Sequence, residues 1–287
     1  MRPDPRFRNL SKDFWANARL ISQEVGYTTT VKGEKEIKVP SLAEIRRAFA
    51  DVSLDVRHLT DNRGEATPFG SLLCDYFKYR ASVLRRQVEP LLMTAEEAKD
   101  AFERLRGKLK PKCSLPLNKQ SGDKKAPAYF TGVINMLVEA NAKGISCDFD
   151  PRVLTTVTRG GMPVRTLARR IDGAFPSAVN PVAVWEIKEY YYTTTFGSRV
   201  ADGVYESLLD GMELEELRVS EGVDIKHYLM IDAHYTWWCC GRSYLCRILD
   251  MLHMGYVDEV LFGREVLKRL PSLVREWGSM ARARKEP

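Results

Sequence analysis

The pattern of apolar and polar residues along the first third of the chain predicts helices and one small β-hairpin. Serines stand in the position of an N-cap before two helical patterns, and the second is followed three residues later by a glutamate, as in a capping box. Turn residues interrupt a run rich in threonine and valine, which is typical of a hairpin. The predicted elements are a helix from the cap Ser11 towards Val25, a hairpin over 26–39, a helix over 42–49 after the cap Ser41, and a helix over 69–86.

In the second half of the chain, runs of β-branched and aromatic residues alternate with stretches of helical spacing. The predicted order is a helix, three strands, a helix and a strand, with two further helices after them. A strand that is reached through a helix should lie parallel to an earlier strand of the same sheet. The expected fold class is therefore α/β (α+β), with a mixed central sheet flanked by helices. The predicted ranges are helices over 128–142, 197–217, 241–254 and 265–277, and strands over 153–158, 163–172, 182–192 and 227–235.

Composition narrows the class of protein. The hydrophobic fraction of 44% is ordinary for a globular protein. No uninterrupted apolar run approaches the roughly 18 residues that a membrane span needs. The polar first residues are unlike a secretory signal, and six scattered cysteines do not resemble a disulfide framework. We therefore expect a cytoplasmic protein without a membrane partner and, because the sequence lacks a G-x-x-x-x-G-K-[ST] motif, without a nucleotide cofactor.

Positive charge is concentrated in one segment. The net charge is +6, and the segment from Glu103 to Lys125 accounts for all of it, with eight basic residues and two acids. Such a strip suits a phosphate backbone, because each neutralised phosphate releases counterions. A solvated lysine-rich loop is the alternative. The segment ends a mostly helical region over 1–125, which is either a small DNA-binding module or an elaboration of the core that follows over 126–287.

Three ionisable residues fall on two predicted strands. Asp172 ends the strand over 163–172, while Glu186 and Lys188 share one face of the next strand because side chains alternate. The turn between the strands should bring Asp172 close to Glu186. An acid and a lysine inside an apolar strand are costly unless they are paired or bound to a metal. Carboxylates that share a divalent cation suit phosphodiester hydrolysis, and a surface hairpin with a Glu–Lys ion pair is the alternative.

These residues resemble a known motif. Ile171-Asp172-Gly173, followed by Glu186-Ile187-Lys188 with thirteen residues between Asp172 and Glu186, resembles the motif of the PD-(D/E)XK nuclease superfamily. The predicted order over about 128–235 also resembles the αβββαβ restriction-endonuclease-like core of that superfamily. One departure is that Ile171 stands where a proline usually precedes the aspartate. The resemblance implies a Mg²⁺-dependent endonuclease, with Mn²⁺ as a substitute.

The resemblance also implies roles for individual residues. Asp172 and Glu186 correspond to the metal ligands, with the carbonyl of Ile187 as a third. Lys188 corresponds to the lysine that orients or deprotonates the attacking water. The candidates for a further acid from an upstream helix are Asp75 and Glu65. The residues expected to contact DNA are Lys119, Lys124, Lys125, Arg159, Arg169, Arg170 and Arg199.

The size of the chain indicates which nucleases of this superfamily it resembles. A stand-alone chain of this length resembles type II restriction endonucleases, which cut double-stranded DNA at specific sites as homodimers. A repair or mobile-element nuclease with the same core is the enzymatic alternative. A non-catalytic DNA-binding protein that retains the fold is the alternative from a different class.

Overall fold

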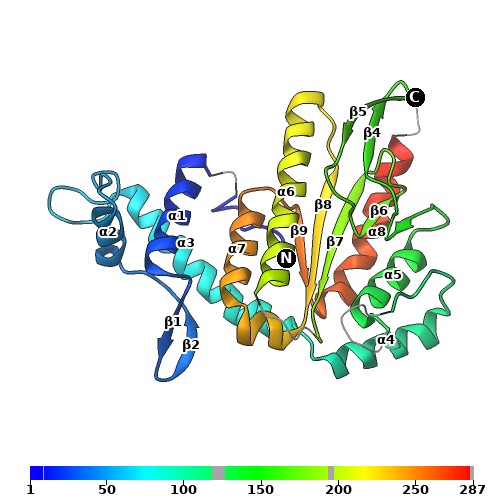
Figure 1. Ribbon diagram of the computed structural model, residues 1–287, viewed down its shortest axis with the longest axis horizontal. Coiled ribbons are helices and arrows are strands. Elements are labelled where there is room, and N and C mark those ends of the chain that lie inside the picture. The colour runs from blue at the N-terminus through cyan, green and yellow to red at the C-terminus, as the bar shows by residue number, and fades with distance from the viewer. Residues whose placement is uncertain (9, 118–126, 193–196, 285–287) are drawn as a thin grey trace.

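The computed structural model describes residues 1–8, 10–117, 127–192 and 197–284. In these residues the chain has an α+β fold around a mixed sheet of five strands (Figure 1). In sheet order, the strands are β3 (Asp148–Phe149), β6 (Gly173–Phe175), β7 (Ala183–Glu189), β8 (Lys226–Asp232) and β9 (Glu259–Phe262). β6 is antiparallel to both of its neighbours, β3 and β7, whereas β7, β8 and β9 run parallel. The predicted parallel strand after a crossover helix is confirmed as β8, and β9 was not predicted.

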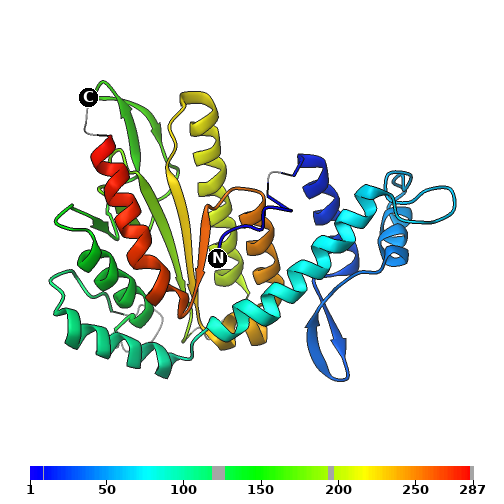
Figure 2. The same cartoon turned by 180° about the vertical axis from the view of Figure 1, so that it is seen from behind.

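Helices cover both faces of the sheet. One face carries α4 (Ala95–Leu109), α5 (Tyr129–Asn141) and α8 (Glu265–Ala283), and the other carries α6 (Ser198–Glu221) and α7 (Arg242–His253). Figure 2 shows α8 crossing the sheet on the side away from α6. The four helices predicted for this part of the chain are confirmed as α5, α6, α7 and α8. No helix within the described ranges is both long and apolar enough to span a membrane.

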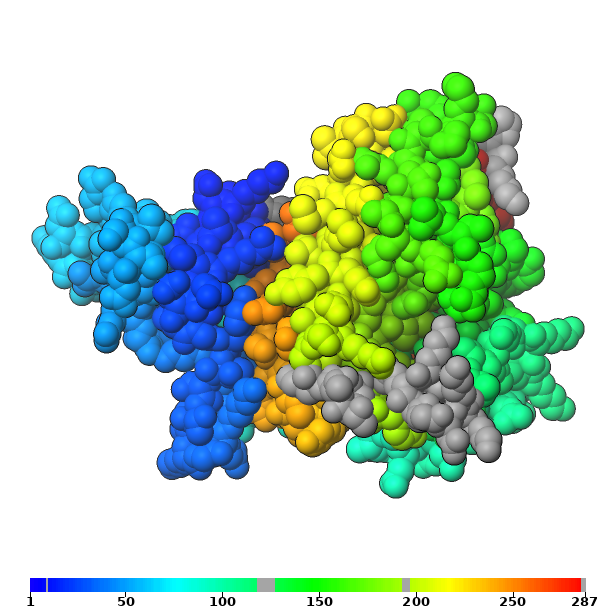
Figure 3. Space-filling view, in the orientation of Figure 1, coloured from blue at the N-terminus to red at the C-terminus, as the bar shows by residue number. Residues whose placement is uncertain are grey.

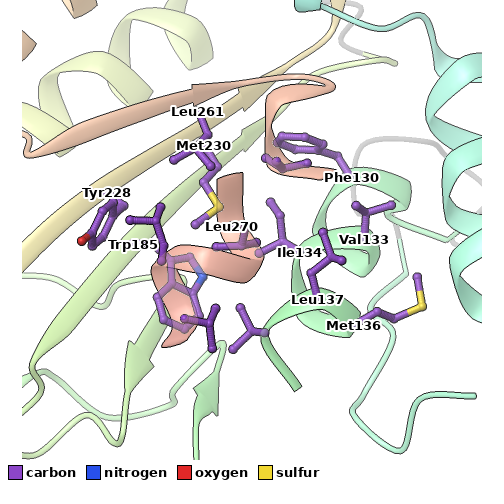
Figure 4. Close-up of a cluster of buried hydrophobic side chains, with 14 of the residues drawn as sticks. Phe130, Val133, Ile134, Met136, Leu137, Trp185, Tyr228, Met230, Leu261 and Leu270 are labelled. Atoms are coloured by element: carbon purple, nitrogen blue, oxygen red, sulfur yellow. The ribbon is translucent and has the colours of Figure 1, made fainter. Parts of the chain in front are cut away.

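Alternation along β7 divides its side chains between the two helical layers. Trp185 and Ile187 face α5 and α8, where Trp185 is fully buried and stacks on Trp277 of α8 with centroids 5.3 Å apart. Figure 4 shows Trp185 among the buried side chains of this layer, with Ile134 of α5 and Leu270 of α8. Glu186 and Lys188 therefore face the layer of α6. The predicted separation of these two residues from Ile187 is confirmed.

Two predicted strands do not belong to the central sheet. β4 (Thr156–Arg159) and β5 (Met162–Thr166) pair with each other in a separate two-stranded sheet. The strand expected over 163–172 is therefore wrong in extent, because it ends at Thr166 and Asp172 instead lies directly before β6. The cause is burial: β5 has no buried residue, whereas all three residues of β6 are buried. In the central sheet the αβββαβ order is α5, β3, β6, β7, α6 and β8, and the β4–β5 hairpin lies between β3 and β6 in the sequence.

The N-terminal region forms a lobe beside α6 and α7 (Figures 1 and 3). Its elements are α1 (Lys12–Val25), β1 (Thr28–Val31), β2 (Glu34–Ile37), α2 (Leu42–Asp51) and α3 (Pro68–Val83). The side chains of Ser11 and Ser41 accept the expected N-cap hydrogen bonds, and Glu44 completes the capping box. The predicted helices and hairpin of this region are confirmed. Its own core contains Phe14, Trp15, Phe49, Leu73, Tyr76 and Phe77.

A segment of short turns leads from this lobe to the core. α3 continues into a π-helical turn, η1 (Leu84–Val88), and then a 3₁₀ turn, η2 (Glu89–Leu91). A further π-helical turn, η3 (Tyr235–Cys240), lies later in the chain, after β8. After η2 comes α4, which was not predicted although Thr94 and Glu97 form a capping box at its start. Phe102 of α4 packs into the same core as α5. The first part of the basic segment is therefore helical, with Arg104, Arg106 and Lys108 on α4.

A buried ion pair joins the lobe to the sheet domain. Arg80 of α3 is 1% exposed and donates hydrogen bonds of 3.1 Å to both carboxylate oxygens of Asp250 on α7. Tyr76 donates to the same carboxylate, and Ser22 of α1 accepts from the guanidinium. A charged group this deeply buried requires its partner, so α3 and α7 are held together by more than apolar packing.

Candidate active site

The predicted site residues come together where β6 begins beside β7. The backbone N–H of Asp172 donates to Oε1 of Glu186 at 3.2 Å, and Oδ2 of Asp172 accepts from the backbone N–H of Ile187 at 2.7 Å. The prediction that a turn brings Asp172 beside Glu186 is confirmed. The close approach depends on Gly173, since a Cβ atom at that position would lie 2.1 Å from the indole of Trp185.

Glu186 and Lys188 are buried under α6. Glu186 is fully buried and Lys188 is 6% exposed, and Nζ of Lys188 lies 2.8 Å from Oε2 of Glu186. The same ammonium donates to Oε2 of Glu206 on α6 at 3.0 Å. The helix approaches this closely because Gly203 faces the lysine, where a Cβ would lie 3.1 Å from its side chain. The interpretation as a surface hairpin with an exposed ion pair is wrong.

Arg169 completes the cluster from the loop between β5 and β6. Its Nη1 lies 3.1 Å from Oε1 of Glu186 and 2.6 Å from Oδ2 of Asp210 on α6. Its Nη2 lies 3.2 Å from Oε2 of Glu186 and 3.2 Å from Oε2 of Glu206. We refer to these side chains as the ionic cluster: Asp172, Glu186, Glu206, Asp210, Arg169 and Lys188.

The ionic cluster contains more acid than base. Among the described residues, Arg169 and Lys188 contact three carboxylates, those of Glu186, Glu206 and Asp210. Asp172 adds a fourth carboxylate and is linked to Glu186 through its own backbone N–H. Burial and the neighbouring Glu186 raise the pKa of Asp172 to about 6 and that of Asp210 to about 7. Burial also opposes ionisation of Glu186, but Lys188 and Arg169 outweigh it and hold the pKa of Glu186 below its ordinary value. Both pKa values are raised because burial and the negative charge of Glu186 outweigh the attraction of Arg169 and Lys188.

Lys188 remains protonated in this arrangement. Burial acts to lower the pKa of Lys188, but the carboxylates of Glu186 and Asp172 together outweigh burial and raise the pKa far above its usual value. The resemblance implied that Lys188 either orients or deprotonates the attacking water. Orienting the water is compatible with an ammonium group. Taking a proton from water is not, because the group has no free lone pair.

The residues fit a divalent cation in charge but do not form a complete metal site. Magnesium binds through one or two carboxylates and keeps several waters, so Asp172 and Glu186 are a sufficient pair. When all four carboxylates are ionised, the cluster lacks two positive charges, which equals the charge of one such ion. In the part of the chain that the structure describes, however, no group of three His, Cys, Asp or Glu side chains is placed to hold a metal ion. Nitrogens of Arg169 and Lys188 lie against the carboxylate oxygens instead.

Two cavities give access to Asp172. One, of about 460 Å³, lies on the α5 side and is lined by Asp150, Asp172 and Glu189 among others. The other, of about 360 Å³, is lined by Asp150, Arg169, Arg170, Ile171 and Asp172. The site is thus reachable from solvent although Glu186 is not. Beside the larger cavity, the carboxylate of Glu189 accepts hydrogen bonds of 2.9 Å from the backbone and hydroxyl of Thr131 in the first turn of α5.

The predicted upstream acids lie elsewhere. Asp75 is on the exposed side of α3, 3.6 Å from Lys78, and Glu65 lies in the loop before α3, where its N–H donates to Asp61. Within the described residues, no hydrogen bond or ion pair connects either acid to the ionic cluster. The additional carboxylates come from α6 instead. A sequence signal existed, because the small residues Gly203, Ser207 and Gly211 mark the face of α6 that packs against the sheet.

The residues predicted to contact DNA have different surroundings. Lys119, Lys124 and Lys125 lie outside the described residues. Arg169 is partly buried, and its guanidinium contacts the carboxylates of Glu186, Glu206 and Asp210. Arg159 pairs with Glu221 at 3.1 Å. Arg170 and Arg199 are exposed, and Arg170 lines the smaller cavity beside Asp172.

Comparison with known families covers most of the chain. Residues 93–277 match the family described as a domain of unknown function, DUF7687, and the chain belongs to that family. Residues 1–87 match a second family of the same description, DUF7690. The two matches meet at the turns η1 and η2, which join the lobe to the core. No curated protein and no solved structure matches the chain.

Proposed function

We propose that this chain is a magnesium-dependent endonuclease of the PD-(D/E)XK type that hydrolyses phosphodiester bonds in double-stranded DNA. The observation that carries the proposal is the meeting of Asp172, directly before β6, with Glu186 and Lys188 on β7, in a mixed sheet with αβββαβ order. A buried acid–lysine pair with a second carboxylate beside it has a large desolvation cost. A catalytic role for the set gives that cost a reason.

Each residue has a defined part in this proposal. Asp172 and Glu186, with the carbonyl of Ile187, would hold the cation, which would polarise the scissile phosphate and lower the pKa of a bound water. Lys188 would donate hydrogen bonds from its ammonium group to the water or to the phosphate. Arg170, exposed at the smaller cavity, would contact the DNA backbone and help to orient it. Cutting both strands at a specific site by a homodimer, as in type II restriction enzymes, belongs to the same proposal.

The rivals differ in measurable ways. A repair or mobile-element nuclease would use the same residues but would cut at no fixed sequence. A non-catalytic DNA-binding protein would bind DNA and leave it intact. The complete set of Asp172, Glu186 and Lys188 favours an enzyme, since a protein that only binds DNA has no use for a buried lysine between two carboxylates.

The test is digestion of a supercoiled plasmid by the whole chain in Mg²⁺ and in excess EDTA. The wild type should nick or linearise the plasmid in Mg²⁺ alone, and Asp172→Asn, Glu186→Gln and Lys188→Met should each abolish cutting. Glu216→Gln is a matched control, because Glu216 pairs with Arg165 at the surface. Sequencing the ends would show whether cutting is site-specific. Undiminished cutting in EDTA, or by the Lys188→Met variant, would contradict the assignment.

A further inference from the structure

We infer that Arg169 occupies the cation position of this site in the free protein, and that it leaves to contact a DNA phosphate when DNA and the metal bind. The inference rests on the proposed nuclease function, which supplies the phosphate and the metal. It adds a residue to the reaction and predicts that the free protein binds divalent cations poorly.

The first argument is the geometry around Glu186. Both oxygens of this carboxylate already contact positive nitrogens: Oε1 lies 3.1 Å from Nη1 of Arg169, and Oε2 lies 2.8 Å from Nζ of Lys188 and 3.2 Å from Nη2 of Arg169. A divalent ion on Glu186 would be placed beside a guanidinium of the same sign. Two such cations repel strongly at contact distance in a buried site, so one of them must withdraw.

The second argument is that the guanidinium does not complete the ionic cluster. Asp210 is fully buried, and its Oδ2 binds Arg169, but its Oδ1 has no hydrogen-bond partner within the described part of the chain. Buried polar atoms of native proteins are rarely left in this way. A structural ion-pair network would be expected to balance its charges. This one leaves two carboxylates in excess, as a site built for a higher charge would.

The third argument is that Arg169 can leave more easily than Lys188. Lys188 is fixed in a strand of the sheet and is nearly buried, whereas Arg169 belongs to the irregular segment between β5 and β6. The Arg169 side chain is 23% exposed, and it lines the smaller cavity together with Arg170 and Asp172. A phosphate that enters this cavity meets both arginines. Guanidinium binds phosphate in a bidentate manner, so the phosphate offers Arg169 a partner comparable to the one it gives up.

Exchange of this kind couples the two ligands. DNA withdraws Arg169 and thereby raises the affinity of the site for the metal, and by linkage the metal raises the affinity for DNA by the same factor. The opposing interpretation is that Arg169 has only a structural role and permanently links the loop before β6 to α6 through its ion pairs. The two interpretations predict different responses to metal when the arginine is removed.

The experiment measures Mn²⁺ binding by the whole chain without DNA, by titration calorimetry and by the thermal midpoint. Arg169→Gln should melt below the wild type without metal, bind Mn²⁺ about tenfold more tightly, and regain its midpoint as Mn²⁺ is added. Arg165→Gln is the matched control, because Arg165 pairs with Glu216 near the surface, and it should resemble the wild type. Adding Glu186→Gln to Arg169→Gln should remove the gain. A destabilised Arg169→Gln variant that Mn²⁺ does not restore would overturn the inference.

A second measurement needs no variant of Arg169. The free Mn²⁺ signal in electron paramagnetic resonance gives the affinity of the wild type with and without a short duplex whose phosphodiesters resist cleavage. The double variant Asp172→Asn/Glu186→Gln with the same duplex corrects for Mn²⁺ held by DNA. The corrected affinity should rise about tenfold with DNA. Tight Mn²⁺ binding by the wild type in the absence of DNA would refute the inference.

The outcomes separate this inference from the proposed function. If Arg169→Gln gains Mn²⁺ affinity but no form of the protein cuts DNA, the nuclease proposal fails. Arg169 would still occupy the cation position of a metal site in the free protein. If the wild type cuts DNA but Arg169→Gln has an unchanged Mn²⁺ affinity, the nuclease proposal stands and the inference fails.

Discussion

Removing Asp250 should destabilise the whole molecule, because it leaves Arg80 charged and buried without its partner. The guanidinium is 1% exposed, and its other hydrogen bonds go to Ser22 at 3.3 Å. Breaking a buried pair in this way costs about 3–5 kcal/mol. At about 2 cal/mol/K of unfolding entropy per residue, a loss near 4 kcal/mol lowers the thermal midpoint of this chain by about 7 °C.

The assay is thermal melting followed by circular dichroism, with Asp250→Ala compared to Arg80→Met/Asp250→Leu. The double variant removes both charges at similar volume, so it should recover most of the loss. The remainder is the hydroxyl of Tyr76, which loses its acceptor at a cost of about 1–3 kcal/mol. A midpoint for Asp250→Ala within about 2 °C of the wild type would refute the reasoning, since it would mean a loss of only about 1 kcal/mol. So would a double variant that melts no higher than Asp250→Ala.

Three further predictions concern DNA binding and pH. Replacing Lys119, Lys124 and Lys125 together by alanine should weaken binding to all DNA sequences and reduce the salt slope by about 2–3, and an unchanged slope would make the segment a solvated loop. Asp172→Ala should tighten metal-free DNA binding in a gel shift, because a carboxylate about 4 Å from a phosphate is repelled by about 4 kcal/mol before screening; weaker binding would contradict this. Burial raises the pKa of Asp232 to about 7, above its ordinary 3.8, so its contribution to stability is complete below pH about 4 and is lost as pH rises to about 7. Melting between pH 5 and 8 should therefore favour Asp232→Asn increasingly over the wild type, and parallel curves would contradict the shift.

The local features of the fold were predictable from the sequence, whereas strand pairing was not. The caps Ser11 and Ser41 and the hairpin of β1 and β2 depend on residues a few positions apart, so a short window contains the signal. The hairpin of β4 and β5 has the same β-branched character as a central strand. Only the competition for burial decides that Gly173–Phe175 enters the sheet instead. β3 and β9 are two and four residues long, too short to form a pattern of their own.

The candidate site was predictable as a motif but not as a cluster. Strand alternation correctly placed Glu186 and Lys188 on one face, and the turn placed Asp172 beside them. Glu206 and Asp210 were missed because their position depends on how α6 is rotated over the sheet, which is a property of tertiary packing. Arg169 was predicted to contact DNA because it is one of several arginines near the strand that leads to Asp172, and its contacts with carboxylates were not foreseen. Its three carboxylate partners come from two elements that follow it in the sequence.

The placement of the tryptophans gives this molecule optical reporters in each of its layers. Trp15 lies in the core of the N-terminal lobe, Trp185 and Trp277 lie between the sheet and α8, and Trp237 and Trp238 lie under α7, all at most 6% exposed. Indoles in such surroundings emit at short wavelength and shift to the red when water reaches them. In a variant that keeps a single tryptophan, the emission would therefore report on the layer that contains this tryptophan. Their fluorescence would reveal whether the two family segments of the chain lose their structure in one step or in two.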